Sequence, residues 1–231
     1  MKAHVFKEIR SVVQDASGIQ IQDGKESMIS ARIGQRLKKL SLTDEVEYLE
    51  YLKDEFEREL VELLNVISTN VTSWYREGEH FKILEEAVKG WASDGQRRMR
   101  LWCAASSTGE EPYTICFTMS EALKNARNVD WRLLATDIST RVLHEASEGS
   151  YTPERLSGIP DAIRNRYFDD EGSSHRVQQG LRNRVSFKRL NLSSPPFPMK
   201  GPLDAIFCRN VMIYFDTELR ARLVAEFHRL L

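Results

Sequence analysis

The sequence lacks long apolar runs, a strong net charge and abundant cysteine, and each absence excludes a class of protein. No run of about 18 apolar residues occurs in the 231-residue chain, so we expect no membrane-spanning helix and no direct insertion into a membrane. The net charge of −1 provides no field that would gather DNA or RNA, so no nucleic-acid partner is expected. The three cysteines form no CxxC pair and the five histidines show no ligand spacing, which predicts no metal site.

The cysteine usage and the first residues predict a cytoplasmic protein. An odd number of cysteines (Cys103, Cys116 and Cys208) fits a reducing compartment. The first fifteen residues, MKAHVFKEIRSVVQD, mix charges with apolar residues at helical spacing and do not resemble a signal peptide.

Residues 1–66 are predicted to form a small all-helical N-terminal domain. Four apolar stripes at helical spacing run through it, and each indicates one short amphipathic helix. The stripes are Phe6, Ile9 and Val13; Ile29, Ile33, Leu37 and Leu40; Val46, Leu49 and Leu52; and Leu60, Leu63, Leu64 and Ile67.

The second of these helices carries basic residues and no acid between residues 27 and 43. The basic residues are Arg32, Arg36, Lys38 and Lys39, and the stretch that follows, 44–62, is rich in acids. The charge pattern alone favours two solvated faces that attract each other, because charge runs mostly solvate a surface. The alternative is a basic face that docks an acidic partner.

From residue 99 onward strands and helices alternate, which predicts a parallel sheet built from βαβ units. The expected strands are 99–104, 131–136, 185–190 and 203–208, and the expected helices are 110–126, 140–147 and 217–231. Residues 151–184 interrupt the alternation and predict a small inserted subdomain, with short strands near 167–168 and 176–178. Residues 67–98 are expected to form a linker and a helix at the seam. Ligands of parallel sheets bind at the carboxyl ends of the strands, so functional residues are expected there.

The turn after the first strand, residues 104–112 (AASSTGEEP), places two acids at the start of a helix. Its single glycine and the absence of a following lysine exclude both the GxGxxG fingerprint and a P-loop. Two carboxylates would repel a pyrophosphate and suit a nucleoside or a cationic group. Thr108 and Glu111 match a capping box, so Glu111 is predicted to cap the helix and Glu110 to face the ligand.

Three further segments place polar residues at strand ends or at the seam. Asp137 follows the second strand, where an acid commonly accepts ribose hydroxyls, although it can also cap the next helix. Arg209 and Asn210 lie inside an apolar run, where burial requires a partner, either a ligand or a structural network. The seam segment 70–76 (NVTSWYR) contains two hydroxyl residues whose spacing alone favours capping of the next helix.

Taken together, these segments resemble the bacterial chemotaxis receptor methyltransferases of the CheR type. The similar segments are 69–77 (TNVTSWYRE), 107–113 (STGEEPY), 135–138 (ATDI) and 207–215 (FCRNVMIYF), and they stand in the family's order and at its spacing. The resemblance runs from about residue 5 to the end of the chain. STGEEPY together with CRNVMIYF is close to diagnostic of the family.

The resemblance implies a fold, a cofactor and a substrate. The implied fold is α/β, a Rossmann-like S-adenosylmethionine-dependent methyltransferase sheet with the helical N-terminal domain and the inserted β-subdomain. The implied methyl donor is S-adenosylmethionine, with S-adenosylhomocysteine as product, and the implied acceptors are glutamate side chains in the cytoplasmic signalling domains of chemotaxis receptors. The implied cofactor contacts are Asn70, Thr72, Arg76, Glu110, Asp137, Asn191, Leu192, Arg209 and Asn210. Because members are thought to meet the acidic receptor through a basic helix, the resemblance favours docking by Arg32, Arg36, Lys38 and Lys39.

No general base is expected for such a reaction. A glutamate side chain, with a pKa of ~4.3, is already a carboxylate nucleophile at neutral pH, so catalysis consists mainly of positioning in a water-poor site. Arg76 and Tyr214 are therefore predicted only to orient the reactants. Two alternatives stay open: a methyltransferase for a small molecule or RNA, and a non-catalytic module that senses the cofactor. The neutral charge and the lack of an aromatic-basic stripe argue against RNA.

Two features depart from the family's pattern. The insertion leaves little room for the glycine-rich turn of members that bind a receptor tail. The family continues past the position of Leu231 with a glycine turn and further strands, so the methyltransferase domain, 99–231, is expected to lack its C-terminal strands. The strand at 203–208 would then be an apolar, unpaired edge. This predicts either a fragment of a longer protein or edge-to-edge association.

Overall fold

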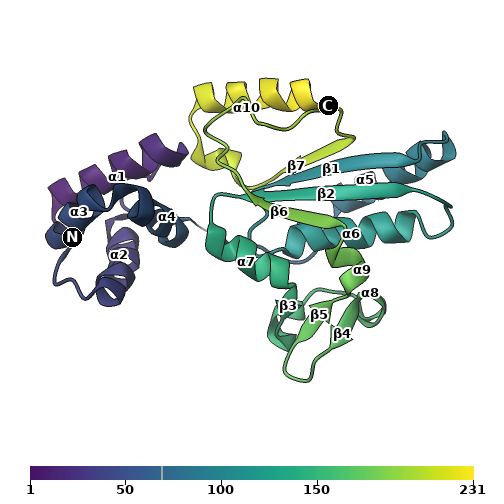
Figure 1. The fold of residues 1–231 in the computed structure, drawn as a ribbon, viewed down its shortest axis with the longest axis horizontal. Helices are drawn as coiled ribbons and strands as arrows, with labels where there is room; N and C mark the ends of the chain where they lie inside the picture. Colours follow the sequence, from purple (N-terminus) through teal and green to yellow (C-terminus); the bar gives the residue numbers. More distant parts are fainter. Residues whose placement is uncertain (69) are drawn as a thin grey trace.

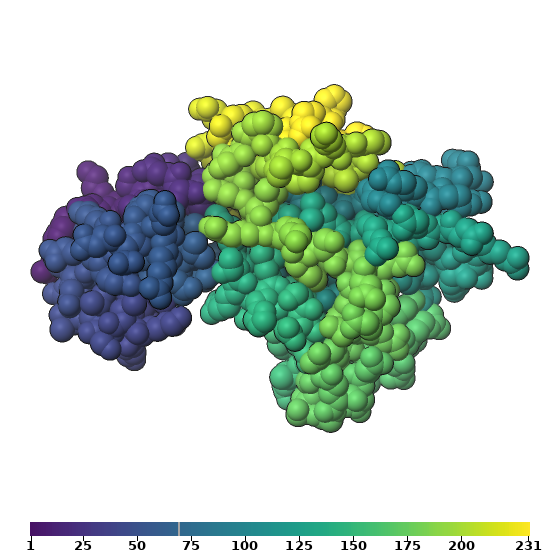
Figure 2. All heavy atoms as spheres, in the orientation of Figure 1, coloured from purple at the N-terminus to yellow at the C-terminus, as the bar shows by residue number. Residues whose placement is uncertain are grey.

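The computed structural model describes residues 1–68 and 70–231 and shows a helical lobe beside an α/β part (Figure 1). The lobe contains α1 (Ala3–Ser17), α2 (Glu26–Leu40), α3 (Glu45–Asp54) and α4 (Phe56–Ile67), so all four predicted helices are present. Their apolar stripes face one another and form a core separate from that of the sheet, with Ile9, Ile33, Leu52 and Leu63 fully buried. Figure 2 shows the lobe as a distinct body at one end of the molecule.

The turn after α1 brings this lobe against the α/β part. Gly18 ends α1 with φ of 71°, and its N–H donates to the Gln14 carbonyl at 2.7 Å. A Cβ at Gly18 would lie 2.5 Å from Leu219 Cδ2, so only glycine fits both the left-handed backbone and the close approach.

The α/β part is built on a parallel sheet at the predicted positions. Its strands are β1 (Arg98–Ala104), β2 (Asp130–Asp137), β6 (Val185–Arg189) and β7 (Ala205–Cys208), in the order β6-β2-β1-β7. Ala104 pairs with Thr136 and with Cys208, and Asp137 pairs with Arg189, so the carboxyl ends of all four strands meet at one edge. Within 1–68 and 70–231, β7 pairs with β1 only, which confirms its predicted position at the edge of the sheet.

Helices cover both faces of the sheet. The helices α5 (Glu79–Ser93), α6 (Glu110–Ala122) and α7 (Thr140–Glu148) cover one face, and α10 (Thr217–Leu230) covers the other (Figure 1). Successive side chains of β1 point to opposite faces of the sheet. Leu101 and Cys103 join the core under α5 and α6, whereas Trp102 and Ala104 join the core under α10. The connection from β7 to α10 contains a short 3₁₀ helix, η2 (Met212–Tyr214).

The predicted insertion is a small antiparallel sheet that protrudes from the α/β part (Figure 2). Its strands β3 (Ser150–Tyr151), β4 (Phe168–Asp170) and β5 (His175–Val177) lie in the order β3-β5-β4. Between them lie η1 (Pro153–Leu156) and α8 (Asp161–Tyr167), and α9 (Gln179–Arg182) leads back to the main sheet. Trp74 joins the insertion to the core, because its ring contacts Tyr151 and Phe168 and its Nε1 donates to the Arg155 carbonyl at 2.6 Å.

Two absences concern the described residues only. None of the helices in 1–68 and 70–231 has the length and apolar character needed to cross a membrane. The same residues contain no group of three or more His, Cys, Asp or Glu side chains arranged to hold a metal ion.

Candidate active site

A cavity opens at the carboxyl edge of the sheet, where the strand-end turns face the helical lobe. It encloses about 880 Å³ when the space open to solvent is counted. Its walls come from the turns after β1, β2, β6 and β7, from the segment 68–76 and from the turn after α1. Nine residues predicted from the sequence line it together: Asn70, Thr72, Arg76, Asp137, Asn191, Leu192, Arg209, Asn210 and Tyr214. Thr69, the first residue of the seam motif, lies outside the described residues.

Asp137 is the last residue of β2 and is held in place by backbone donors. Its Oδ2 accepts from the Ser107 N–H and its Oδ1 from the Ser139 N–H, both at 2.9 Å. Burial raises its pKa, although the backbone donors oppose that shift. The cap of α7 is Ser139, so the alternative that Asp137 caps this helix is wrong. Its carboxylate is therefore a fixed acceptor in the cavity wall.

The turn between β1 and α6 has a strained backbone where it lines the cavity. Ala105 and Ser107 both line the cavity and have positive φ values of 63° and 49°. Such conformations cost of order 1–3 kcal/mol for residues other than glycine and cluster at ligand sites. Gly109 has φ of 100°, and a Cβ there would lie 2.6 Å from the Tyr151 hydroxyl oxygen and 3.0 Å from Ala146 Cβ.

The structure exchanges the predicted roles of the two acids that follow this turn. The N-cap of α6 is Gly109, so the capping box of Thr108 and Glu111 does not form. Glu111 instead lines the cavity, and burial raises the pKa of its carboxyl. Glu110 does not line the cavity: its buried carboxylate accepts from the Thr108 hydroxyl at 2.7 Å and pairs with Arg155 of η1. The prediction that Glu110 faces the ligand is therefore wrong in this structure, because the helix begins one residue later than the box requires.

Arg209 is the centre of a charged network on the side of the cavity next to β7. It donates to Glu111 Oε2 at 2.5 Å, to Glu77 Oε2 at 3.2 Å and to the Arg76 carbonyl, and its guanidinium lies 5.4 Å from the Phe81 ring centre. Its Nε is buried without a hydrogen-bond partner among the described residues. The Cys103 thiol also donates to Glu111, at 3.3 Å.

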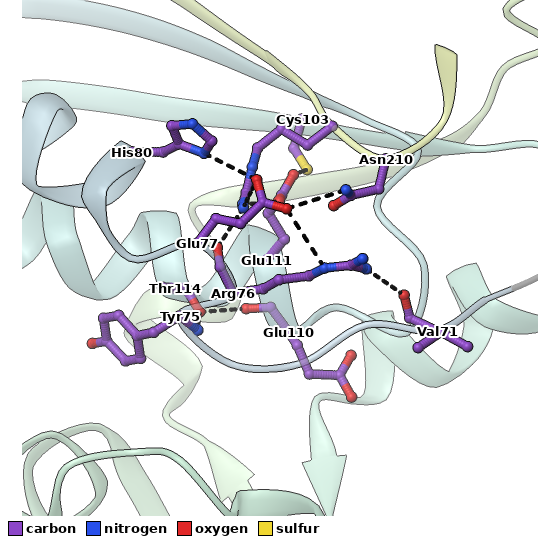
Figure 3. A network of polar contacts seen from close by, with 11 residues as sticks. Val71, Tyr75, Arg76, Glu77, His80, Cys103, Glu110, Glu111, Thr114 and Asn210 are labelled. Carbon is purple, nitrogen blue, oxygen red and sulfur yellow. Dashed lines mark hydrogen bonds and ion pairs between the residues drawn. The ribbon is translucent and has the colours of Figure 1, made fainter. Parts of the chain in front are cut away.

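The loop that carries the seam motif is tied to this network (Figure 3). Glu77 accepts from Asn210 Nδ2 at 3.2 Å, and its pKa is lowered by the hydrogen bonds from Asn210 and Arg209. Arg76 donates to the Val71 carbonyl at 3.0 Å across the same loop. The next helix, α5, is capped at Gly78, so the seam hydroxyls do not cap it.

The opposite wall combines the turn after β6 with the turn after α1. Asn191 Nδ2 donates to the Ala16 carbonyl at 2.7 Å, and its Oδ1 accepts from the backbone N–H and the hydroxyl of Ser193. Leu192 is buried beside the cavity. Ser17 and Ile19 line the cavity from the helical lobe, and the sequence carried no signal for them, since nothing in the pattern shows that the lobe approaches the sheet here.

The predicted basic docking face is only partly exposed. Arg36 is buried and pairs with Glu59 at 2.6 Å and with Glu62 at 3.1 Å, so its inclusion in an exposed face is wrong. Arg32 donates to the Ile67 and Ser68 carbonyls at the end of α4. Lys38 and Lys39 are exposed. Ion pairs between α2 and the acidic residues of α4 thus account for part of the run of basic residues in α2.

Comparison with known proteins agrees with this arrangement. A family model described as "CheR methyltransferase, SAM binding domain" matches residues 70–231, and one described as "CheR methyltransferase, all-alpha domain" matches residues 4–68. The chain belongs to the CheR methyltransferase family. It is 37% identical to the chemotaxis protein methyltransferase of Escherichia coli, over 98% of this chain and 79% of that protein. It is 36% identical to the Borreliella burgdorferi protein of the same name, over 94% of this chain and 80% of that protein, and 36% identical to chemotaxis protein methyltransferase 2 of Pseudomonas aeruginosa, over 98% and 81%.

The cavity of this CheR family member suits the S-adenosylmethionine that its matched domain is described as binding. A buried carboxylate at the end of β2 is the type of acceptor that takes ribose hydroxyls in Rossmann-like sheets. The acid Glu111 lies in the wall on the side where a cationic group can be compensated, and the Arg76 guanidinium, 38% exposed at the cavity, is available to an anionic group. The chain thus offers complementary groups for the hydroxyls, the positive charge and the carboxylate of such a molecule.

Proposed function

We propose that this protein transfers a methyl group from S-adenosylmethionine to glutamate side chains in the cytoplasmic signalling domains of chemotaxis receptors. The observation that supports it most is the convergence of nine predicted residues, from four separate segments of the chain, on one cavity. The names of its relatives support a role in chemotaxis. The proposal places the protein in the cytoplasm, where receptor signalling domains are found.

The residues of the site bind and orient, and none is needed as a base. S-adenosylmethionine supplies an electrophilic methyl group on a positively charged sulfur, and a glutamate carboxylate is a sufficient nucleophile for it at neutral pH. Asp137 would accept from the ribose hydroxyls, and Leu192 would cover an apolar ring. Arg76, with a side chain 38% exposed at the cavity, would orient the incoming carboxylate together with Tyr214. Holding reactants in this way can contribute ~7–11 kcal/mol.

The receptor would approach over α2 and the mouth of the cavity. Because Arg36 is buried in its pair with Glu59, the docking role is assigned to the exposed Lys38 and Lys39, although Lys39 also lies 3.6 Å from Glu62. Exposed charges act over about 8–10 Å at moderate salt, so their contribution would appear in the KM for receptor and weaken as salt rises.

The test is a methylation assay with a purified receptor signalling fragment and S-adenosylmethionine, read by peptide mass spectrometry. A mass increase of one methyl group on glutamate supports the proposal. An increase on another residue type or on an added small molecule points to a different acceptor. If S-adenosylhomocysteine binds by calorimetry but no acceptor gains a methyl group, the protein is a non-catalytic module that senses the cofactor.

A further inference from the structure

Three polar contacts join the helical lobe to the carboxyl edge of the sheet, each at the end of a different strand. Asn191, after β6, donates to the Ala16 carbonyl, and the Gln20 N–H donates to the carbonyl of Tyr214, after β7, at 2.9 Å. The third contact comes from Asn65 of α4 and reaches the turn after β2. The lobe therefore contacts the turns that form the cavity and not only the outer surface of the sheet.

Asn65 uses both ends of its amide in this contact. Its Oδ1 accepts from the Ser139 hydroxyl at 2.8 Å, and its Nδ2 donates to the Thr140 hydroxyl at 3.2 Å. The side chain is 5% exposed and lies in the last turn of α4, where Leu63, Leu64 and Ile67 are also buried. Burying a polar side chain costs free energy unless it is hydrogen-bonded. The two hydrogen bonds to Ser139 and Thr140 offset that cost for Asn65 and make its contact with the turn after β2 specific.

The partner of Asn65 leads directly to the acid of the cavity. The Ser139 hydroxyl donates to Asn65 Oδ1 at 2.8 Å and, as the cap of α7, accepts from the Val142 N–H at 3.4 Å. The backbone N–H of Ser139 donates to Asp137 Oδ1 at 2.9 Å. Asp137 Oδ2 is fixed independently by the Ser107 N–H. Ser139 thus places one of the backbone donors that orient this carboxylate, and its own hydroxyl is held by Asn65 of the helical lobe.

We propose that Asn65 is a positioning residue, through which the helical lobe sets the Asp137 carboxylate for the ribose hydroxyls of the cofactor. It acts through Ser139 and does not itself line the cavity. The inference rests on the proposed function, because it takes Asp137 as the ribose acceptor. Its consequence is that the lobe contributes to cofactor affinity through the contact from α4, in addition to any role in docking.

The test is a double-mutant cycle in which calorimetry measures the binding of S-adenosylhomocysteine to the full chain. Asn65→Ala should weaken binding about fivefold to thirtyfold, the range expected when the hydrogen bond that orients Asp137 is weakened or lost. Asp137→Ala should weaken binding at least as much. If Asn65 acts through Asp137, the double variant should bind no more weakly than Asp137→Ala alone, whereas independent effects would multiply.

Two further variants separate positioning from general destabilisation. Tyr48→Phe removes a buried hydrogen bond to Glu59 inside the helical lobe, far from the turn after β2, and should leave affinity unchanged even if it lowers the melting temperature. Ser139→Ala removes the hydroxyl that Asn65 holds and should weaken binding as Asn65→Ala does. It also serves if Asn65→Ala does not fold.

The outcomes are distinct for the two proposals. If Asp137→Ala leaves affinity unchanged, the ribose assignment fails, and the role of Asn65 fails with it. If Asp137→Ala weakens binding but Asn65→Ala and Ser139→Ala do not, or if their effects multiply with that of Asp137→Ala, the positioning role is refuted and the cofactor site stands. A loss of affinity in Tyr48→Phe equal to that in Asn65→Ala would also refute it.

Discussion

Replacing Arg209 by methionine should destabilise the fold at neutral pH by leaving Glu111 buried without its cation. The two side chains are 10% and 13% exposed, so little water can take the place of the lost partner. Removing one member of a buried ion pair typically costs about 3–5 kcal/mol. We expect about 3 kcal/mol, the lower end, because a carboxyl with a raised pKa can relieve part of the cost by taking up a proton.

The pH dependence gives the prediction its sign. Burial already raises the pKa of Glu111 and Arg209 opposes that shift, so in the variant the folded-state pKa rises further above the unfolded value. Between those two pKa values the folded state binds more protons than the unfolded state, and stability therefore increases as pH falls. The deficit relative to wild type should be largest above the folded pKa of the variant and shrink as pH drops toward the unfolded pKa.

Urea unfolding of wild type, Arg209→Met and Arg209→Met with Glu111→Gln, at about pH 8 and about pH 5, measures this effect. The double variant should recover part of the loss at pH 8, because a neutral amide needs no counter-charge. Equal deficits at both pH values, or a double variant no more stable than Arg209→Met, would show that Glu111 is not the group left unpaired.

Three other changes test separate features of the fold. Gly109→Ala should destabilise the fold by more than 1 kcal/mol in urea unfolding, because the added Cβ meets the Tyr151 hydroxyl and the backbone has positive φ. Arg36→Ala should cost about 3–5 kcal/mol by the same assay, since it leaves the buried Glu59 carboxylate without a cation. A loss below about 1 kcal/mol would show that Arg36 is not buried in this pair. Charge reversal of Lys38 and Lys39 together should raise the KM for a receptor fragment at low salt and leave the affinity for S-adenosylhomocysteine unchanged. The control Lys124→Glu, in the turn after α6, should change neither.

The elements of the fold were predictable because each has a clear local pattern. Apolar residues at helical spacing marked α1 to α4, and short apolar runs separated by helices marked the four parallel strands. Parallel topology then brings strand ends to one edge, which is why Asp137 and Arg209 could be expected together, whereas Leu192 was expected only from the resemblance to the CheR family.

The orientation of Glu110 and Glu111 and the burial of Arg36 could not be predicted, because they depend on small rotations and on contacts between distant elements. The capping residue of α6 is Gly109 rather than Thr108, and a shift of one residue turns a helical side chain by about 100°, which moves Glu111 into the cavity and Glu110 away from it. Arg36 is buried because Glu59 lies opposite it on another helix, and no pattern within α2 indicates that. Charge runs alone therefore overestimated the basic surface.

The residues that line the cavity are spread over the sequence from Ser17 to Phe215. The cavity therefore forms only when almost the whole polypeptide has folded. Contacts between such distant residues are slow to form because long segments must first be closed into loops. Binding of S-adenosylhomocysteine should therefore occur only in the completely folded protein, and not in a state that has formed secondary structure alone. At a ligand concentration 100 times Kd, binding to the folded state alone raises stability by ~2.7 kcal/mol, so a shift in the urea midpoint can distinguish a fully assembled molecule from a partly folded one that keeps its helices.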